Sequence, residues 1–91
     1  MRLPTSFALN TGYPNPFNPS TTISFSIPEH AHVQLRVFDL LGRLVQTLMN
    51  DDKESGRYST TWNALGMPSG VYFCRMTAGD FVQTQKLVLA R

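Results

Sequence analysis

A chain of 91 residues, 42% of them hydrophobic and 15% charged, has the length and composition of one globular domain with one modest core. The net charge is only +2 and the basic residues form no run, which argues against a nucleic-acid-binding protein. The apolar stretches are too short to span a bilayer, and the single cysteine excludes an internal disulfide.

Early in the chain, three prolines alternate with asparagine and with two aromatic residues. The segment consists of Tyr13, Pro14, Asn15, Pro16, Phe17, Asn18 and Pro19. Each proline fixes φ and removes a backbone donor, which predicts a stiff, extended loop with Tyr13 and Phe17 held against the fold. This loop either braces the edge of a sheet or is itself a recognition epitope. We expect residues 1–12 to be a lead-in segment, with Phe7–Leu9 as a candidate further strand, and residues 13–91 to be the domain.

After this segment, apolar and polar residues alternate with the two-residue period of half-buried strands. The predicted strands cover residues 22–27, 33–37, 43–49, 58–62, 71–77 and 81–89. The third strand is the least regular, and a polar loop is expected at residues 50–56. Asp39 and Gly42 predict a turn in which the aspartate accepts backbone N–H groups and the glycine takes a positive φ. With Trp62 as the central core residue, the pattern predicts an all-β, immunoglobulin-like antiparallel β-sandwich of about seven strands.

These markers, taken in order, resemble a known family. They are the 13–19 segment with the Ser-Thr-Thr-Ile that follows it, residues 37–45, Trp62-Asn63, Ser69-Gly70-Val71-Tyr72-Phe73 and Lys86-Leu87-Val88-Leu89. Together they resemble the type A C-terminal sorting domain of the type IX (Por) secretion system, and they are similar to the immunoglobulin-like domain of flagellar hook-capping proteins. The loop from Trp62 to Ser69 is shorter than is common in the family.

The resemblance implies a non-catalytic sorting and cell-surface attachment module at the C-terminus of a larger secreted protein, without a cofactor. An N-terminal passenger would be exported across the outer membrane to the cell surface or the extracellular space. The implied partners are the outer-membrane type IX machinery, with its shuttle receptor and sortase-like peptidase. We expect a monomer, and the chain's first residues, which show no exported leader, suggest an excised module.

Candidate recognition residues follow from the same motifs. They are Gly70, Val71, Tyr72, Lys86, Val88, Leu89 and Arg91. For residues 70–72 the structural alternative is a tyrosine corner, in which the Tyr72 hydroxyl binds a loop backbone and the ring fills the core. For the last strand the alternative is an ordinary edge strand with solvated basic residues. If that edge is free, a partner could add a strand to it.

Catalytic and metal chemistry find little support in the residue inventory. His30 and His32 flank a strand start, and Cys74 is expected to be an inert core thiol, so no metal or nucleophile site is predicted. The acidic residues near position 52 lack the spacing of a full calcium ligand set. Two other functions stay open. One is carbohydrate binding through the rings of Tyr13, Phe17, Tyr58 and Tyr72, and the other is structural assembly of the hook-cap type.

Overall fold

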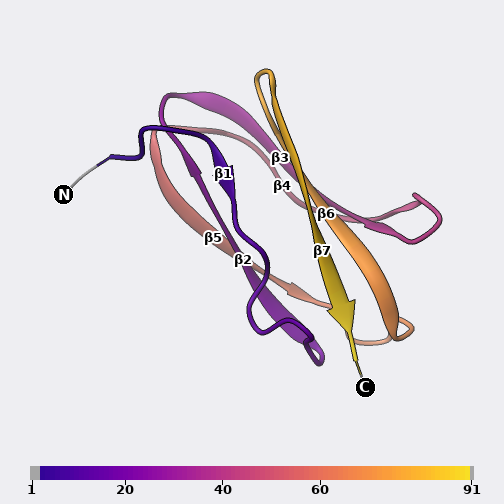
Figure 1. Ribbon diagram of the computed structural model, residues 1–91. Coiled ribbons are helices and arrows are strands. Elements are labelled where there is room, and N and C mark those ends of the chain that lie inside the picture. Colours follow the sequence, from indigo (N-terminus) through magenta and orange to yellow (C-terminus); the bar gives the residue numbers. More distant parts are fainter. Residues whose placement is uncertain (1–2, 91) are drawn as a thin grey trace.

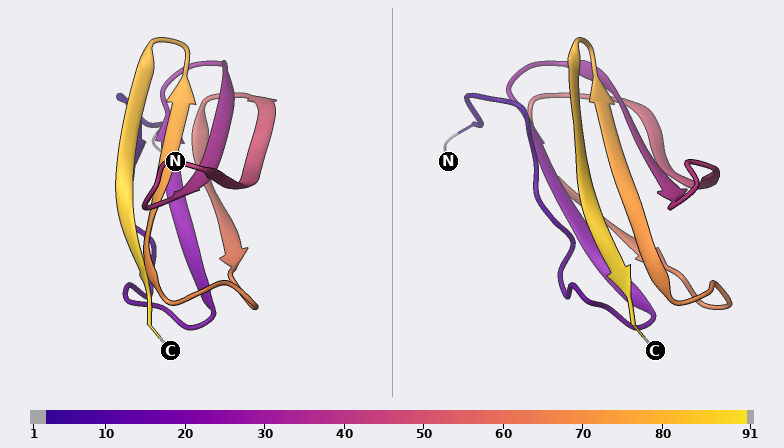
Figure 2. Two further views of the ribbon diagram at one scale, coloured as in Figure 1. Left: turned by 90° about the vertical axis from the view of Figure 1, so that its right-hand side faces the viewer. Right: turned by 45° about the vertical axis from the view of Figure 1, so that its right-hand side comes forward.

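The computed structural model describes residues 3–90, which form seven strands and no helix. The strands are β1 (Ala8–Leu9), β2 (Ser20–Ile27), β3 (Ala31–Asp39), β4 (Leu44–Lys53), β5 (Gly56–Asn63), β6 (Gly70–Ala78) and β7 (Phe81–Leu89). They make two antiparallel sheets, ordered β1–β2–β5 and β4–β3–β6–β7, which pack as two layers (Figure 1, Figure 2). The all-β sandwich is confirmed, and so is a short strand within Phe7–Leu9.

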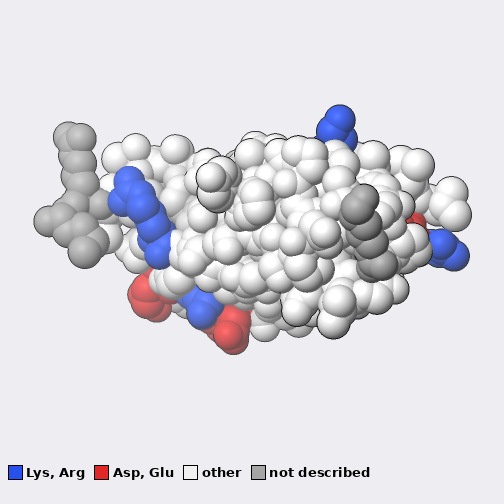
Figure 3. Space-filling view, turned by 90° about the horizontal axis from the view of Figure 1, so that it is seen from below, with Lys and Arg blue, Asp and Glu red and all other residues white. Residues whose placement is uncertain are grey.

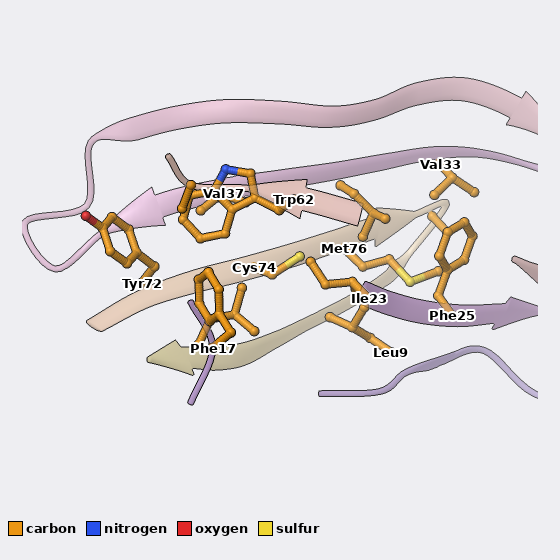
Figure 4. Packing of buried hydrophobic residues seen from close by; sticks show 14 of the residues in the cluster. Leu9, Phe17, Ile23, Phe25, Val33, Val37, Trp62, Tyr72, Cys74 and Met76 are labelled. Atoms are coloured by element: carbon orange, nitrogen blue, oxygen red, sulfur yellow. The ribbon is translucent and has the colours of Figure 1, made fainter. Parts of the chain in front are cut away.

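The core lies between the two sheets and is built by the alternation seen in the sequence. In β2 and β3 every second side chain is buried, and polar or half-buried residues lie between them. Trp62, with 1% of its surface exposed, packs against Phe17 at a ring-centroid distance of 5.5 Å and against Tyr72 at 5.2 Å. Figure 4 shows these three rings gathered at one end of the core. The prediction of Trp62 as a central core residue is therefore confirmed.

Strand β4 is longer than predicted. The expected loop at residues 50–56 is wrong except for residues 54–55: residues 50–53 continue β4 and pair with the start of β3, and Gly56 begins β5. The register between these strands shifts twice, next to Leu35 and next to Val37. Such irregularities break a strict two-residue period, because an extra residue on one strand turns the following side chains to the other face. This explains why the residues from Leu44 to Met49 did not alternate cleanly.

The turn from β3 to β4 has the predicted chemistry. The Asp39 carboxylate accepts the backbone N–H groups of Leu41 and Arg43, each at 2.9 Å, and the Arg43 Nε at 2.8 Å. Gly42 has φ of 83°, a conformation that side chains with a Cβ rarely adopt. Because the Arg43 backbone N–H binds the Asp39 carboxylate, the pKa of Asp39 lies below its ordinary value.

None of the described residues belongs to a helix long and apolar enough to cross a membrane. The chain enters the sandwich at one end, and its last described residues leave at the other (Figure 1). The turns β2–β3, β4–β5 and β6–β7 lie at the end near residue 3. The strands β3, β5 and β7 run the opposite way. The segments that follow them, which are the turn β3–β4, the loop β5–β6 and the last residues of the chain, therefore lie toward the other end.

Candidate recognition surface

The two predicted recognition motifs lie side by side, although they are far apart in sequence. Strands β6 and β7 pair in antiparallel register, with Gly70 opposite Leu89, Val71 opposite Val88, and Tyr72 opposite Leu87. The register continues with Phe73 opposite Lys86. The two motifs therefore form one continuous piece of sheet at the end of the molecule where the chain leaves it.

The members of these motifs divide between the two faces of the sheet. Tyr72 and Leu89 point into the core and are buried. Val71, Lys86 and Val88 occupy the alternate positions, so their side chains lie on the outer face, and we call these three residues the tail face. Gly70 is exposed at the start of β6, and Arg91 lies outside the described residues.

Tyr72 has the geometry expected for a tyrosine corner. Its ring contacts Trp62 edge-on, and its hydroxyl donates a 2.6 Å hydrogen bond to the backbone carbonyl of Pro68. The residue therefore joins the β5–β6 loop to the core, and the structural expectation for it is confirmed. As a buried residue, it offers a partner little surface.

The outer edge of β7 is covered by the proline-rich segment. The Asn15 side chain acts like a strand residue: its Nδ2 donates to the Lys86 carbonyl at 3.0 Å, and its Oδ1 accepts the Val88 N–H at 2.9 Å. Phe17 continues the contact with two backbone bonds, to the Val88 carbonyl at 2.9 Å and from the Ala90 N–H at 3.0 Å. From Lys86 to Ala90 the edge is thus closed, so a partner cannot add a strand there without displacing this segment.

The prediction that this segment is extended along its whole length is wrong, because the chain bends at residues 14–16 and 18–19. The peptide bonds that precede its three prolines are cis. Phe17 is buried in the core, as expected, whereas Tyr13 is 82% exposed, so the prediction that its ring is held against the fold is wrong. Its backbone is held instead, through a bridge to Thr22 on β2. The segment therefore closes the sandwich between β2 and β7, which supports its reading as an edge brace.

A groove lies beside the tail face, between the β3–β4 turn and the β5–β6 loop. It has a volume of about 290 Å³ and includes Gly70, Val71 and Tyr72 in its lining. Several exposed leucines lie near it in the two loops and at the start of β4: Leu40, Leu41, Leu44 and Leu65. Figure 3 views the molecule from below and shows a largely uncharged surface with charged side chains near its margins. Sequence reasoning missed this groove, because the two loops are not adjacent in the chain.

The other side chains that were considered for reactivity or metal binding, Cys74 and His32, have structural surroundings. Burial raises the pKa of the Cys74 thiol to about 12, which leaves the thiolate scarce at neutral pH, as expected for an inert core residue. His32 Nδ1 lies 2.7 Å from an Asp52 oxygen and its Nε2 lies 2.7 Å from the Asn50 Oδ1. The pKa of His32 is raised, mainly because of the hydrogen bond to Asp52 and then because of the one to Asn50. Among residues 3–90, no group of three or more His, Cys, Asp or Glu side chains is arranged to hold a metal ion.

The aromatic residues proposed for carbohydrate binding do not form a shared exposed platform. Of the four rings, those of Phe17 and Tyr72 are buried, and Tyr58 is half-buried, stacked on Phe25 at 5.4 Å. Only Tyr13 is exposed among them. A single exposed ring gives this alternative no support from geometry.

Comparison with known proteins gives one clear relationship. The family model of the secretion system C-terminal sorting domain matches residues 11–90, which is nearly the whole chain. Comparisons with curated proteins and with solved structures gave no match. Domains of this type IX secretion family occur on proteins that are exported across the outer membrane to the cell surface or extracellular space. The sandwich with its paired β6 and β7 motifs thus belongs to the family of secretion system C-terminal sorting domains.

Proposed function

We propose that this domain is recognised, after folding, by an outer-membrane component of the type IX machinery that contacts the tail face. The observation that carries the proposal is the direct pairing of the two motifs, which sets Val71 and Val88 opposite one another with Lys86 beside them. A receptor that reads the folded sheet can contact both motifs at once. A receptor that reads an unfolded tail would instead need residues, such as Leu89, that are buried here.

In this proposal the domain has no catalytic role, works as a monomer and needs no cofactor. An N-terminal passenger would lie beyond the end where residue 3 is placed (Figure 1), and the residues of the tail face and groove would lie toward the opposite end of the strands. The shuttle receptor would bind first, and the sortase-like peptidase would then act on the exported protein at the surface. The domain therefore supplies an address, and the passenger supplies the activity.

The test is surface display of a reporter in a host with a working type IX apparatus. Deleting Lys86 and the residues after it is unsuitable, because Leu87 and Leu89 are part of the core and their loss would unfold the domain. We would instead fuse the intact domain to a periplasm-targeted fluorescent protein and compare it with the variants Lys86→Glu and Val88→Ser. Both substitutions change the outer face and leave the core intact.

Matched controls come from the same chain. Lys53→Glu makes the same charge change at the opposite end of the molecule, and Val82→Ser makes the same polar change at an exposed position of β7. Proposed recognition predicts display of the intact domain and both controls, with retention of Lys86→Glu and Val88→Ser in the periplasm. Thermal melts verify that every variant is folded. Display of all five proteins would refute a role for the tail face, and retention of all five would refute sorting by this domain.

The exposed leucines around the groove favour a second candidate, structural assembly through protein–protein contact. Leu40, Leu41 and Leu65 are each more than half exposed, which is typical of a surface that packs against another protein. Assembly with itself predicts a concentration-dependent increase in mass by sedimentation. A constant monomer mass would leave sorting as the better account.

A further inference from the structure

The outer face of the four-stranded sheet carries three cations close to two aromatic rings. Arg36 on β3 lies directly opposite Arg75 on β6, and Phe38 lies opposite Phe73 in the same pair of strands. Phe73 in turn lies opposite Lys86 on β7. We call these five residues the cationic face. It adjoins the tail face and shares Lys86 with it.

The two arginines form an unfavourable pair in isolation. Like charges placed directly opposite one another on neighbouring strands destabilise a sheet. Both guanidinium groups also lie against one ring, with the Arg36 Cζ 5.6 Å and the Arg75 Cζ 4.7 Å from the centroid of Phe38. The ring attracts each cation, but it carries no net charge that could cancel their mutual repulsion.

None of the five residues of the face is acidic. Among residues 3–90, ion pairs such as His30–Glu54, His32–Asp52 and Arg43–Asp39 are present, and none is found that includes Arg36, Arg75 or Lys86. Most of the acidic side chains lie near the opposite end, in the turns after β2 and β6 and in the β4–β5 hairpin. These are Glu29, Asp51, Asp52, Glu54 and Asp80. The cationic face is therefore complementary to an anion supplied by another molecule.

A hollow beside Arg75 indicates what accompanies that anion. Its volume is about 170 Å³, and its lining includes Phe38, Phe73, Arg75 and Thr84. Asp39 also lines it, but Arg43 and two backbone N–H groups already bind that carboxylate. An apolar cavity of about 150 Å³ holds a benzene-sized group. The hollow therefore has room for one apolar side chain next to a cation, which is the pattern of an acidic and apolar polypeptide.

We propose that the cationic face binds an extended acidic segment of a partner protein. One carboxylate of the segment binds between Arg36 and Arg75, where the planar guanidinium groups can donate paired hydrogen bonds. A neighbouring apolar side chain enters the hollow against Phe38 and Phe73. The inference rests on the proposed sorting function in one respect, that this segment belongs to the export machinery.

An anionic membrane surface is a less suitable partner. Recognition of anionic lipids typically uses clusters of about four to eight lysines and arginines, and this face carries Arg36, Arg75 and Lys86. The side-chain-sized hollow also has no counterpart in a lipid headgroup layer. Binding to vesicles is therefore treated as an alternative outcome that the experiment must distinguish.

The experiment follows amide and guanidinium NMR signals of the ¹⁵N-labelled domain during titration. The probes are a synthetic peptide that alternates valine with glutamate, the same peptide with glutamine in place of glutamate, and vesicles containing phosphatidylglycerol. We expect the glutamate peptide to shift signals of β3 and β6 around Arg36 and Arg75, and the glutamine peptide to bind at least about tenfold more weakly. Added salt should weaken the first interaction more than the second.

Two variants locate the site. Arg75→Gln should weaken binding of the glutamate peptide at least about tenfold, since it removes a charge-assisted contact. The matched variant Lys53→Gln, which removes one charge at the far end, should change it by less than about twofold. Because Arg75→Gln relieves the repulsion with Arg36 but also loses the contact of its guanidinium with Phe38, its melting temperature should stay close to that of the parent. Equal binding of both peptides, equal binding by Arg75→Gln, or binding to vesicles alone would overturn the proposal.

Reporter display then separates this inference from the sorting function. If the intact domain is displayed and the double variant Arg36→Gln/Arg75→Gln is retained while folded, both proposals are supported. If the double variant is displayed as well as the intact domain, the acidic-partner proposal fails and sorting stands. If the intact domain itself is retained, sorting fails, and peptide binding alone decides whether the face recognises acidic segments.

Discussion

The amide of Asn15 stands in for a missing strand neighbour of β7, and replacing it tests this reading. Asn15→Ala removes two hydrogen bonds to β7, one to the Lys86 carbonyl and one from the Val88 N–H, and a third, exposed one to the Thr11 hydroxyl. Each such bond contributes about 0.5–1.5 kcal/mol net. The site is exposed, so water replaces part of that contribution, and we expect a loss of about 1–2 kcal/mol in the free energy of unfolding.

The assay combines a thermal melt with hydrogen exchange. For a domain of this size, 1 kcal/mol corresponds to roughly 4–8 °C in melting temperature, which predicts a decrease of about 4–16 °C for Asn15→Ala. Exchange of the Val88 N–H should accelerate, because its acceptor is gone, while the Ala90 N–H keeps the Phe17 carbonyl as acceptor.

Asn18→Ala is the matched control within the same segment. Asn18 is exposed, and none of the side-chain hydrogen bonds among the described residues involves it, so its replacement should change stability by less than about 0.5 kcal/mol. Equal stability of the Asn15→Ala protein and the parent, with unchanged exchange at Val88, would refute the view that this amide completes the sheet edge.

Three further predictions follow from buried or hydrogen-bonded side chains. Tyr72→Phe should lower the free energy of unfolding by about 0.5–1.5 kcal/mol in urea, because it leaves the Pro68 carbonyl without its hydroxyl donor; no change would contradict the corner. Cys74, with a pKa of about 12, should react with a thiol reagent at pH 8 only in denaturant, and rapid labelling of the folded domain would disprove its burial. His32 should titrate above 6.5 by NMR, so its contribution to stability is full below pH 6.5 and is lost as pH rises through the higher folded pKa. Asp52→Asn should lower that midpoint, and a midpoint at or below 6.5 in the parent protein would oppose this.

Alternation of side chains was sufficient to predict the strands whose two faces differ. In β2 and β3 one face is buried and the other is not, so the two-residue period is visible in the sequence. Strand β4 lies at the edge of its sheet and is buried on neither face, so its last residues, Asn50 to Lys53, have the composition of a loop. Hydrogen bonding to β3 makes them a strand, and composition carries no record of that pairing.

The sequence was sufficient to predict those features of the candidate site that depend on one strand alone, namely which face each side chain occupies. Tyr72, Lys86 and Val88 take the faces that alternation assigns to them. The contact between Asn15 and β7 joins positions 71 residues apart and depends on where the proline-rich segment bends. The groove and the cationic face likewise arise from loops or strands that meet only after folding. Their residues carry no signal in the sequence until the register of β3, β6 and β7 is known.

Contacts between the two ends of the fold set the order in which the domain can be completed during synthesis. The Leu9 backbone exchanges hydrogen bonds with Gln83 and Gln85, which lie 74 and 76 positions later, and Phe17 pairs with the last residues of β7. Contacts of such high sequence separation slow folding, because a long loop must close before they form. Until β7 has left the ribosome, Leu9 and Phe17 lack the residues that bury them. A chain interrupted before β7 would therefore remain unfolded. The complete sheet can form only after all residues before β7, and β7 itself, have been synthesised.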